Sequence, residues 1–319
     1  MNEQAPHTPS QAARSEPRIL VISPVRDEAR FIDAAIDSMC AQTVRPAAWV
    51  IVNDGSSDDT SAIAKARARE TDFIHVVDKP DRGRRQVGSG VIEAFNYGLA
   101  AAPISDWNYI VKLDADITYG PRYIERMLAE FASDDRLAAV SGRVFRPEPG
   151  GDVEERKSPD MVCGPFKFYR RAAFEAIGGF EQTLQWDGID IHRARMTGWR
   201  TRNIPDAEAR IHHHRLMGSS EVSIVHGRLR WGRGIHFMGY HPAYAVVSGV
   251  YRMRDWPYVV GGLLIITGYF SAAARGAERY PDPTFRANLR AWQRQQLAAL
   301  PRTLFNAVRR RLGKGPAQP

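Results

Sequence analysis

Short apolar runs alternate with helical patterns through the first third of the chain, and this alternation restricts the fold more than any other feature. Four runs are typical of buried strands, at 18–23, 48–52, 73–77 and 109–113. Apolar residues recur at helical spacing between them, over 31–39, 60–70 and 91–101. Strands that alternate with helices form a parallel sheet covered by helices on both faces. We therefore expect an α/β fold.

The pattern changes after Pro121. A helix is predicted over 123–132, then strands over 137–145 and 166–169, and a helix over about 187–197. The polar segment 146–160, rich in Pro and Gly, has the composition of a loop, and such loops often cover a site. Beyond His214 the sequence becomes helical, aromatic and apolar.

Polar clusters follow three of the predicted strands directly. They are Pro24–Glu28, Asn53–Ser56 and Asp114–Asp116. In open α/β sheets, ligands bind outside the carboxyl ends of the strands. The three clusters therefore predict a nucleotide-type site at this edge, although periodicity alone does not name the chemistry.

The Asp114-Ala115-Asp116 segment carries the strongest chemical signal. Two carboxylates just past a buried strand can hold a divalent cation against a diphosphate, and their hard oxygen ligands suit Mg²⁺ or Mn²⁺. Such an ion neutralises charge on a phosphate leaving group. Acidic pairs are also common on surfaces, but their position after Tyr109–Leu113 favours a site.

The other two clusters each allow a structural explanation. Asp54, followed by Gly55-Ser56, can accept hydrogen bonds from a base or ribose hydroxyl, or it can cap the next helix. The Pro24–Glu28 segment can pass close to a nucleoside, or it can simply turn into a helix. Neither cluster alone decides between these alternatives.

In combination the motifs PVRDE (24–28), VNDGS (52–56) and LDADI (113–117) resemble the family 2 inverting glycosyltransferases with the GT-A fold. The order and distances of the motifs match, over about residues 18–215. The sequence departs from the family pattern at Arg26, where Asn is usual, and at Asn53, where Asp is usual. The resemblance implies a Rossmann-like mixed, mostly parallel sheet flanked by helices, with a helical apolar C-terminal extension left unexplained.

The resemblance also assigns roles to residues. Asp54 would contact the base or ribose, Asp114 the ribose or a metal-bound water, and Asp116 the metal that holds the diphosphate. Further nucleotide-sugar contacts are expected from Pro24, Arg26, Glu28, Arg84, Arg85 and Arg215. For Arg84 and Arg85, an exposed basic loop is an equal alternative.

The catalytic base implied by the resemblance is Asp187. It lies in Trp186-Asp187-Gly188, upstream of Gly198-Trp199-Arg200, as in family members that carry an acidic pair at a helix start. A carboxylate there can deprotonate an acceptor hydroxyl during attack on the anomeric carbon, which inverts the configuration. The alternatives are a helix N-cap for Asp187 and a supporting role for Asp190.

A run of three histidines, His212 to His214, ends the region of resemblance. Some relatives use a His here as a metal ligand, and strand alternation puts His212 and His214 on one face, so either is a candidate ligand. An exposed polar loop and a separate zinc site remain alternatives, although adjacent histidines on a strand rarely converge on one ion.

The excess charge of this 319-residue chain lies at its C-terminus. The net charge is +8, and ten Lys/Arg against two Asp/Glu follow from Arg275 onward. A basic tail suits an anionic surface or is merely a solvated helix. Nucleic acid is disfavoured as a partner, because the basic residues do not spread over the core domain. Two cysteines without metal or redox spacing fit a reducing cytoplasm.

Residues 256–274 contain no charge over 19 positions. Since a spanning helix needs about 20 apolar residues, this segment can be an interfacial or re-entrant element, a single span, or a buried helical hairpin. We expect a disordered lead-in over 1–16, a GT-A glycosyltransferase domain over 17–218, and a helical, membrane-associated region over 219–319. The protein would then lie on the inner face of the cell membrane.

The expected function is transfer of a sugar from a nucleotide sugar, with UDP-sugar favoured, to a glycan or lipid-linked acceptor in cell-surface polysaccharide synthesis. The alternatives are a sugar nucleotidyltransferase and a non-catalytic binding protein of the same fold. The first would need a Gly-rich loop after the first strand, which PVRDEARF lacks. The second would be expected to lack one of Asp54, Asp116 and Asp187, and all three are present.

Overall fold

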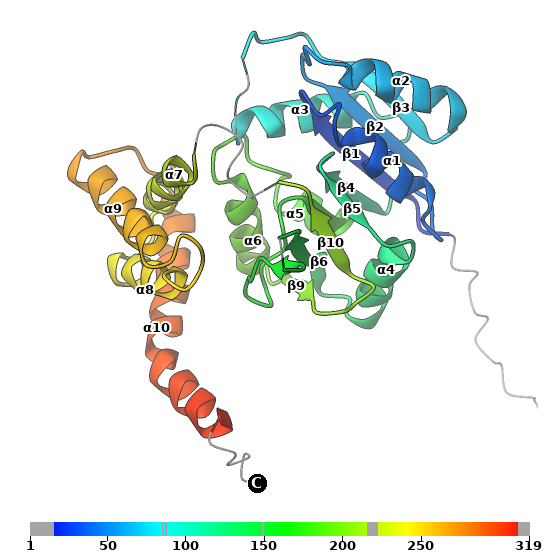
Figure 1. The fold of residues 1–319 in the computed structure, drawn as a ribbon. Coiled ribbons are helices and arrows are strands. Elements are labelled where there is room, and N and C mark those ends of the chain that lie inside the picture. The colour runs from blue at the N-terminus through cyan, green and yellow to red at the C-terminus, as the bar shows by residue number, and fades with distance from the viewer. Residues whose placement is uncertain (1–15, 85, 87, 149, 216–222, 312–319) are drawn as a thin grey trace, which may run out of the picture.

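The computed structural model describes residues 16–84, 86, 88–148, 150–215 and 223–311, with 301–311 described through their main chain alone (Figure 1). Ten strands form one sheet in the order β3-β2-β1-β4-β8-β6-β10-β5, with β7 and β9 also pairing with β6. The strands are β1 (Ile19–Val25), β2 (Ala48–Asn53), β3 (Ile74–Asp78), β4 (Tyr109–Leu113), β5 (Ile117–Tyr119), β6 (Leu137–Arg146), β7 (Val153–Glu154), β8 (Phe166–Arg170), β9 (Arg200–Ile204) and β10 (Arg210–His213).

The sheet is mixed and mostly parallel. Strands β3, β2, β1 and β4 run parallel to one another, and β6 is parallel to both β9 and β10. Strand β8 runs antiparallel between β4 and β6, and β5 runs antiparallel to β10. The α/β class expected from the alternating pattern is confirmed.

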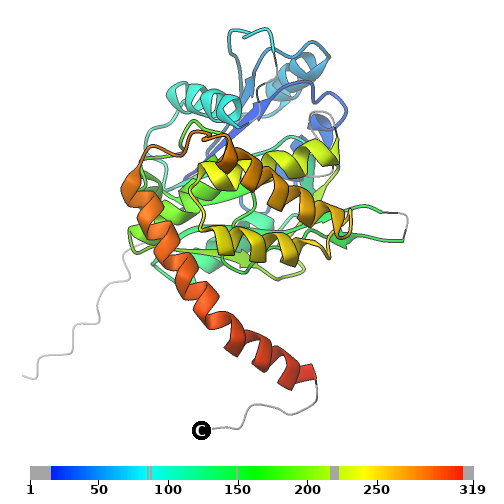
Figure 2. The ribbon, with the colours of Figure 1, turned by 90° about the vertical axis from the view of Figure 1, so that its left-hand side faces the viewer.

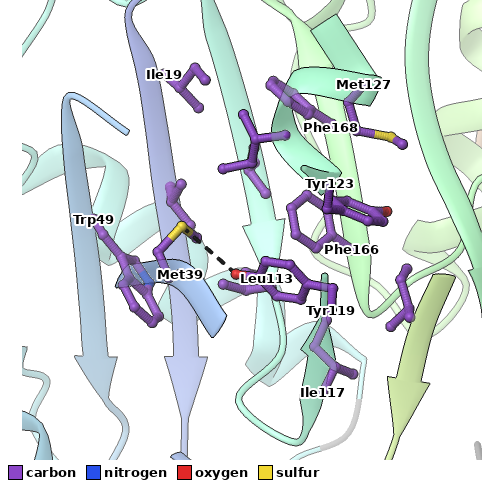
Figure 3. Close-up of a cluster of buried hydrophobic side chains, with 14 of the residues drawn as sticks. Ile19, Met39, Trp49, Leu113, Ile117, Tyr119, Tyr123, Met127, Phe166 and Phe168 are labelled. Atoms are coloured by element: carbon purple, nitrogen blue, oxygen red, sulfur yellow. Dashed lines mark hydrogen bonds between the residues drawn. The ribbon is translucent and has the colours of Figure 1, made fainter. Parts of the chain in front are cut away.

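Helices cover both faces because side chains alternate along each strand. Ile19 and Val21 of β1 pack on one face, with residues of α1 (Ile32–Cys40), α2 (Thr60–Glu70) and α4 (Tyr123–Ser133). Figure 3 shows this cluster, in which the Tyr119 hydroxyl lies 3.7 Å from the Met39 sulfur. Leu20 and Ile22 face the other way, toward α3 (Ser89–Ala100), α5 (Arg171–Ala176) and α6 (Trp186–Met196).

Four further helices form a group to the left of α6 in Figure 1, and Figure 2 shows this group facing the viewer. They are α7 (Ile224–Phe237), α8 (Pro242–Arg252), α9 (Val260–Ala274) and α10 (Pro283–Arg311). A small apolar cluster joins them to the sheet domain, because Ile189 of α6 packs with Met238, Phe285 and Leu289. The domain boundary expected at 218/219 falls within residues that the structure does not describe, as does most of the expected lead-in.

The uncharged segment 256–274 forms a loop and then α9, which packs against α7 and α8. Close approach depends on glycines: a Cβ on Gly232 of α7 would lie 2.1 Å from the Ile265 carbonyl oxygen, and one on Gly262 would lie 2.3 Å from that of Gly249. Helix α9 is 15 residues long. Within the described part of the chain, no helix combines the length and apolar character needed to cross a bilayer.

Candidate active site

The predicted polar clusters meet at one edge of the sheet. Val25 is paired with Asn53 in the parallel register of β1 and β2, and β4 lies on the other side of β1, ending at Leu113. The residues that follow these strands therefore share the carboxyl edge, where α/β sheets bind ligands. Pro24 lies within β1 and is half-buried.

Asp54 lies in a basic pocket immediately after β2. Its buried carboxylate pairs with Arg82 at 2.9 Å and with Lys79 at 3.3 Å, and both cations also pair with Glu93. Arg26 donates a hydrogen bond to the main-chain oxygen of Asp54 at 2.7 Å. The loop after β1 is thus tied directly to the loop after β2.

Asp114 is held by a lysine from its own strand. The buried ammonium group of Lys112 pairs with the Asp114 carboxylate and donates a second hydrogen bond, 3.1 Å long, to the carbonyl oxygen of Gly164. This contact fixes the side chain of Asp114 against the segment that leads into β8.

Asp116 joins the loop after β1 to the end of β10. Its Oδ2 accepts a hydrogen bond from Arg215 Nε at 2.8 Å, and the same guanidinium pairs with the buried Glu28. The Nε2 of His213 lies 3.3 Å from Asp116 Oδ2. Burial by itself raises the pKa of Asp116, but the contacts with His213 and Arg215 outweigh burial and hold that pKa well below its usual range.

The histidine that reaches Asp116 is therefore His213, and neither His212 nor His214 has this contact. His212 Nδ1 instead lies 3.1 Å from Asp152, and His214 Nε2 lies 3.1 Å from the Thr118 hydroxyl. Alternation does put 212 and 214 on one face, but that face is turned away from the core. His213 shares the inner face with the fully buried Ile211.

Asp187 stands in the first turn of α6, opposite the β4 loop. A Cβ on Gly164 would lie 3.7 Å from its carboxylate, and Gly164 is the residue that Lys112 contacts. Among the described residues, none donates a hydrogen bond to the Asp187 carboxylate or forms an ion pair with it. Lys112 therefore links Asp114 to Gly164, which lies beside Asp187, and the Asp187 carboxylate has no hydrogen-bond or ion-pair partner among the described residues.

A buried network supports the first turn of α6. Lys167 of β8 donates a hydrogen bond to the main-chain oxygen of Asp187 at 2.8 Å and pairs with Asp190, which also accepts one from Tyr169 at 2.6 Å. The Trp186 ring lies 5.0 Å from the Lys167 ammonium and 5.3 Å from that of Lys112. The Trp186 indole therefore contacts both the lysine that pairs with Asp114 and the lysine that bonds the main chain of Asp187.

Two predicted arginines are not part of this arrangement. Arg84 is exposed on the loop between β3 and α3, and Arg85 lies outside the described residues. The arginine of the RGRR segment that pairs with Asp54 is Arg82. Sequence inspection also missed Lys112 and Lys167, whose position inside strands of otherwise apolar and aromatic residues was the available signal.

The metal-binding capacity of the site is limited to few side chains. Among the described residues, no group of three or more His, Cys, Asp or Glu side chains is arranged to hold an ion. Asp116 and His213 nevertheless offer one carboxylate and one imidazole in contact, and Nδ1 of His213 has no hydrogen-bond partner in the described part of the chain. A bound diphosphate would have to complete any coordination shell.

A mixed, mostly parallel sheet with helices on both faces is the architecture of the GT-A glycosyltransferases. The chain matches the family model described as glycosyl transferase family 2 over residues 20–186, and it belongs to that family. The resemblance inferred from PVRDE, VNDGS and LDADI is thereby confirmed.

Curated relatives are polysaccharide synthases that are longer than the matched region. A Pasteurella multocida chondroitin synthase is 25% identical over 180 residues, which are 53% of this chain and 18% of that protein. A Staphylococcus aureus poly-beta-1,6-N-acetyl-D-glucosamine synthase is 28% identical over 230 residues, or 66% of this chain. This chain spans only 52% of the latter's length.

The fold is also found in a solved structure. A mannosyltransferase from Pyrobaculum calidifontis, in complex with GDP-Man and Mn²⁺, superposes with a TM-score of 0.53 at 18% identity. The match covers 91% of this chain and 88% of that one, so the helices after the sheet are included to a large extent.

Proposed function

We propose that this protein transfers a single sugar from a nucleotide-sugar donor to a glycan or lipid-linked acceptor, with inversion at the anomeric carbon. The observation that carries the proposal is the position of Asp187, whose carboxylate lies beside Gly164, while the carbonyl oxygen of Gly164 accepts a hydrogen bond from the lysine that pairs with Asp114. A free base facing donor-binding carboxylates is the arrangement that a single displacement requires.

The donor would lie along the carboxyl edge of β1, β2 and β4. Asp54 would accept hydrogen bonds from the base or ribose, with Pro24 and Glu28 lining the same pocket. Arg26 and Arg82 are better placed than Arg84 to counter the diphosphate charge, because both contact Asp54. UDP is the favoured nucleotide, with GDP and dTDP as the alternatives.

Mn²⁺ fits this site better than Mg²⁺. Asp116 and His213 would hold the ion together with the diphosphate, and an imidazole ligand suits Mn²⁺, whereas Mg²⁺ prefers oxygen ligands throughout. The bound ion would offset negative charge on the leaving nucleoside diphosphate. Arg215, which pairs with both Asp116 and Glu28, would add positive charge at the same place.

The chemical step forms one bond and breaks one. The acceptor hydroxyl oxygen bonds to the anomeric carbon as the bond from that carbon to the diphosphate oxygen breaks, and the hydroxyl proton passes to the Asp187 carboxylate. The bonding electrons leave with the nucleoside diphosphate. Lys167, which is completely buried, would position Asp187 through its main-chain oxygen.

The cellular role follows from the relatives. Because the family 2 proteins similar to this chain include chondroitin and poly-N-acetylglucosamine synthases, we infer a role in cell-surface polysaccharide assembly. The acceptor would then be a glycan or a lipid-linked glycan, reached from the cytoplasmic face of the membrane. A nucleotidyltransferase is disfavoured by the family membership.

The deciding experiment is a thermal-shift panel with UDP, GDP, dTDP and CMP, each with and without Mn²⁺. A ligand at a hundred times its dissociation constant adds about 2.7 kcal/mol to the free energy of unfolding. We expect one nucleoside diphosphate to raise the melting temperature only with Mn²⁺, and Asp116→Ala to abolish the shift. No shift in folded protein would instead favour a non-catalytic relative.

A further inference from the structure

Exposed apolar side chains concentrate at one corner of the helical region. Thirteen large apolar residues are exposed among the described residues, and nine of them lie between positions 246 and 270. We call these nine the corner surface: Val246, Val250, Tyr251, Trp256, Tyr258, Val259, Val260, Leu263 and Phe270. Soluble domains rarely gather so many on one patch without a partner for it.

The corner surface lies on two helices that pack against each other and on the loop that joins them. It runs from the end of α8 through the connecting loop into α9, and the two helices are packed together at Gly249 and Gly262 (Figure 2). Tyr258 at its tip is 67% exposed and Trp256 is 49% exposed. Tryptophan and tyrosine are the residues that membrane-water interfaces favour, because each combines an apolar ring with a polar atom.

Arginines outnumber acidic residues beside the corner surface. From Ser223 to Asp255 the chain carries five arginines and a single acidic residue, Asp255, which pairs with Arg252. Arg228 donates a hydrogen bond to the carbonyl oxygen of Trp256 and lies near Glu155. Arg254 is exposed and lies 3.3 Å from the centre of the Tyr251 ring, and Arg252 is also close to that ring. Apolar residues flanked by arginines complement a bilayer that has anionic headgroups, because the arginines add an attraction that a neutral bilayer does not offer.

We propose that the corner surface inserts its aromatic and aliphatic side chains into the headgroup region of an anionic lipid bilayer. No described helix is long and apolar enough to span a membrane, so the protein would bind from one side. A second copy of the chain would also bury apolar residues, but the surplus of arginines would then face arginines.

The corner surface also lies near the active site. Arg252 donates a hydrogen bond, 3.1 Å long, to the carbonyl oxygen of Arg156, just after β7. Strand β7 pairs with Phe145 of β6, and Phe145 is in register with His212 of β10, the strand that delivers His213 to Asp116. A bilayer at this corner would therefore present a lipid-linked acceptor to the His213 side of the site, an extension that rests on the proposed function.

Vesicle cosedimentation of the 319-residue chain tests the proposal. We expect binding to vesicles that contain phosphatidylglycerol, weak binding to phosphatidylcholine alone, and weaker binding at high salt. The triple variant Trp256→Ser/Tyr258→Ser/Leu263→Ser should partition at least about tenfold more weakly. Met196→Ser, on α6 and also partly exposed, should bind like the wild type.

Two outcomes would overturn the proposal. The first is equal vesicle binding by the triple variant and the wild type. The second is a wild type that is a dimer by light scattering and a triple variant that is a monomer, with no vesicle binding by either protein. Nucleotide binding, measured by thermal shift on the same samples, separates the two proposals. The triple variant should bind nucleotide like the wild type. If the wild type binds no nucleotide, only the proposed function is refuted.

Discussion

The ammonium group of Lys167 lies 2.8 Å from the main-chain oxygen of Asp187, and it pairs at the same time with the carboxylate of Asp190. Both Lys167 and Asp190 are completely buried side chains. The position of the proposed base therefore depends on a charge pair that water does not reach.

Lys167→Met should be strongly destabilising, because it leaves the Asp190 carboxylate buried without its cation. Breaking such a pair costs about 3–5 kcal/mol in the free energy of unfolding. Urea unfolding followed by circular dichroism measures this. The double variant Lys167→Met/Asp190→Asn should recover much of the loss, since the amide needs no counter-charge and can still accept from Tyr169. A double variant no more stable than the single one would contradict the assignment.

Asp187→Asn should abolish most of the activity without affecting donor binding. The amide cannot take the acceptor proton, and loss of a general base typically lowers kcat by about 10²- to 10⁴-fold. Nucleotide binding should be unchanged by thermal shift. Asp106→Asn, which changes an exposed carboxylate elsewhere, is the matched control. Full activity in Asp187→Asn would exclude this residue as the base.

His213→Ala and His212→Ala should differ in their response to Mn²⁺. Of these two histidines only His213 contacts the Asp116 carboxylate, so its loss should weaken Mn²⁺-dependent nucleotide binding by about ten- to a hundredfold. His212→Ala should bind like the wild type. Titration calorimetry with and without Mn²⁺ measures both, and the melting temperature without ligand checks the fold. A larger effect at His212 would reverse the assignment.

His192 should make the protein less stable in acid. Burial, with a contribution from Arg195, lowers the pKa of His192 to about 3, whereas the unfolded chain takes up the proton near pH 6.5. Stability is therefore unaffected above pH 6.5 and falls as the pH drops from there toward 3. The loss should reach about 2 kcal/mol by pH 5. His192→Gln, which keeps a hydrogen-bond acceptor for Arg195, should flatten the stability profile over this range, and an unchanged slope would disprove the assignment.

Gly232→Ala should destabilise the helical region, because the added methyl would meet the Ile265 carbonyl oxygen and the Tyr269 nitrogen. Overpacking of this kind costs about 1–3 kcal/mol. Gly120→Ala is the control, since a Cβ there meets nothing within 4 Å. Thermal unfolding of both variants provides the comparison, and equal effects would argue against tight α7–α9 packing.

Sequence periodicity predicted much of the fold because buried strands and amphipathic helices leave local signals. The runs at 18–23, 48–52 and 109–113 correspond closely to β1, β2 and β4. The motif carboxylates could be placed at one sheet edge for the same reason. The side chains that contact these carboxylates could not be predicted, because an ion pair such as that of Arg215 with Glu28 joins residues far apart in the chain.

The histidine run shows a limit of local reasoning. Alternation correctly separates His213 from its two neighbours, but it does not say which face is the inner one. Ile211 indicates the inner face, because it is apolar and lies two positions before His213 on the same side of the strand. The exposure of the corner surface on α8 and α9 could not be predicted either, because the sequence of an uncharged segment does not show whether other parts of the protein cover it.

The glycine contacts of α9 have a geometric consequence. Gly232 and Gly268 are in contact where α7 crosses α9, and Gly249 and Gly262 are in contact where α8 crosses α9. Close main-chain packing therefore holds α9 at two points along its length. An element pinned at two points can neither slide nor roll. The outward face of α9 therefore keeps a fixed orientation relative to α7 and α8, and a planar surface resting on it would hold all three helices at one tilt.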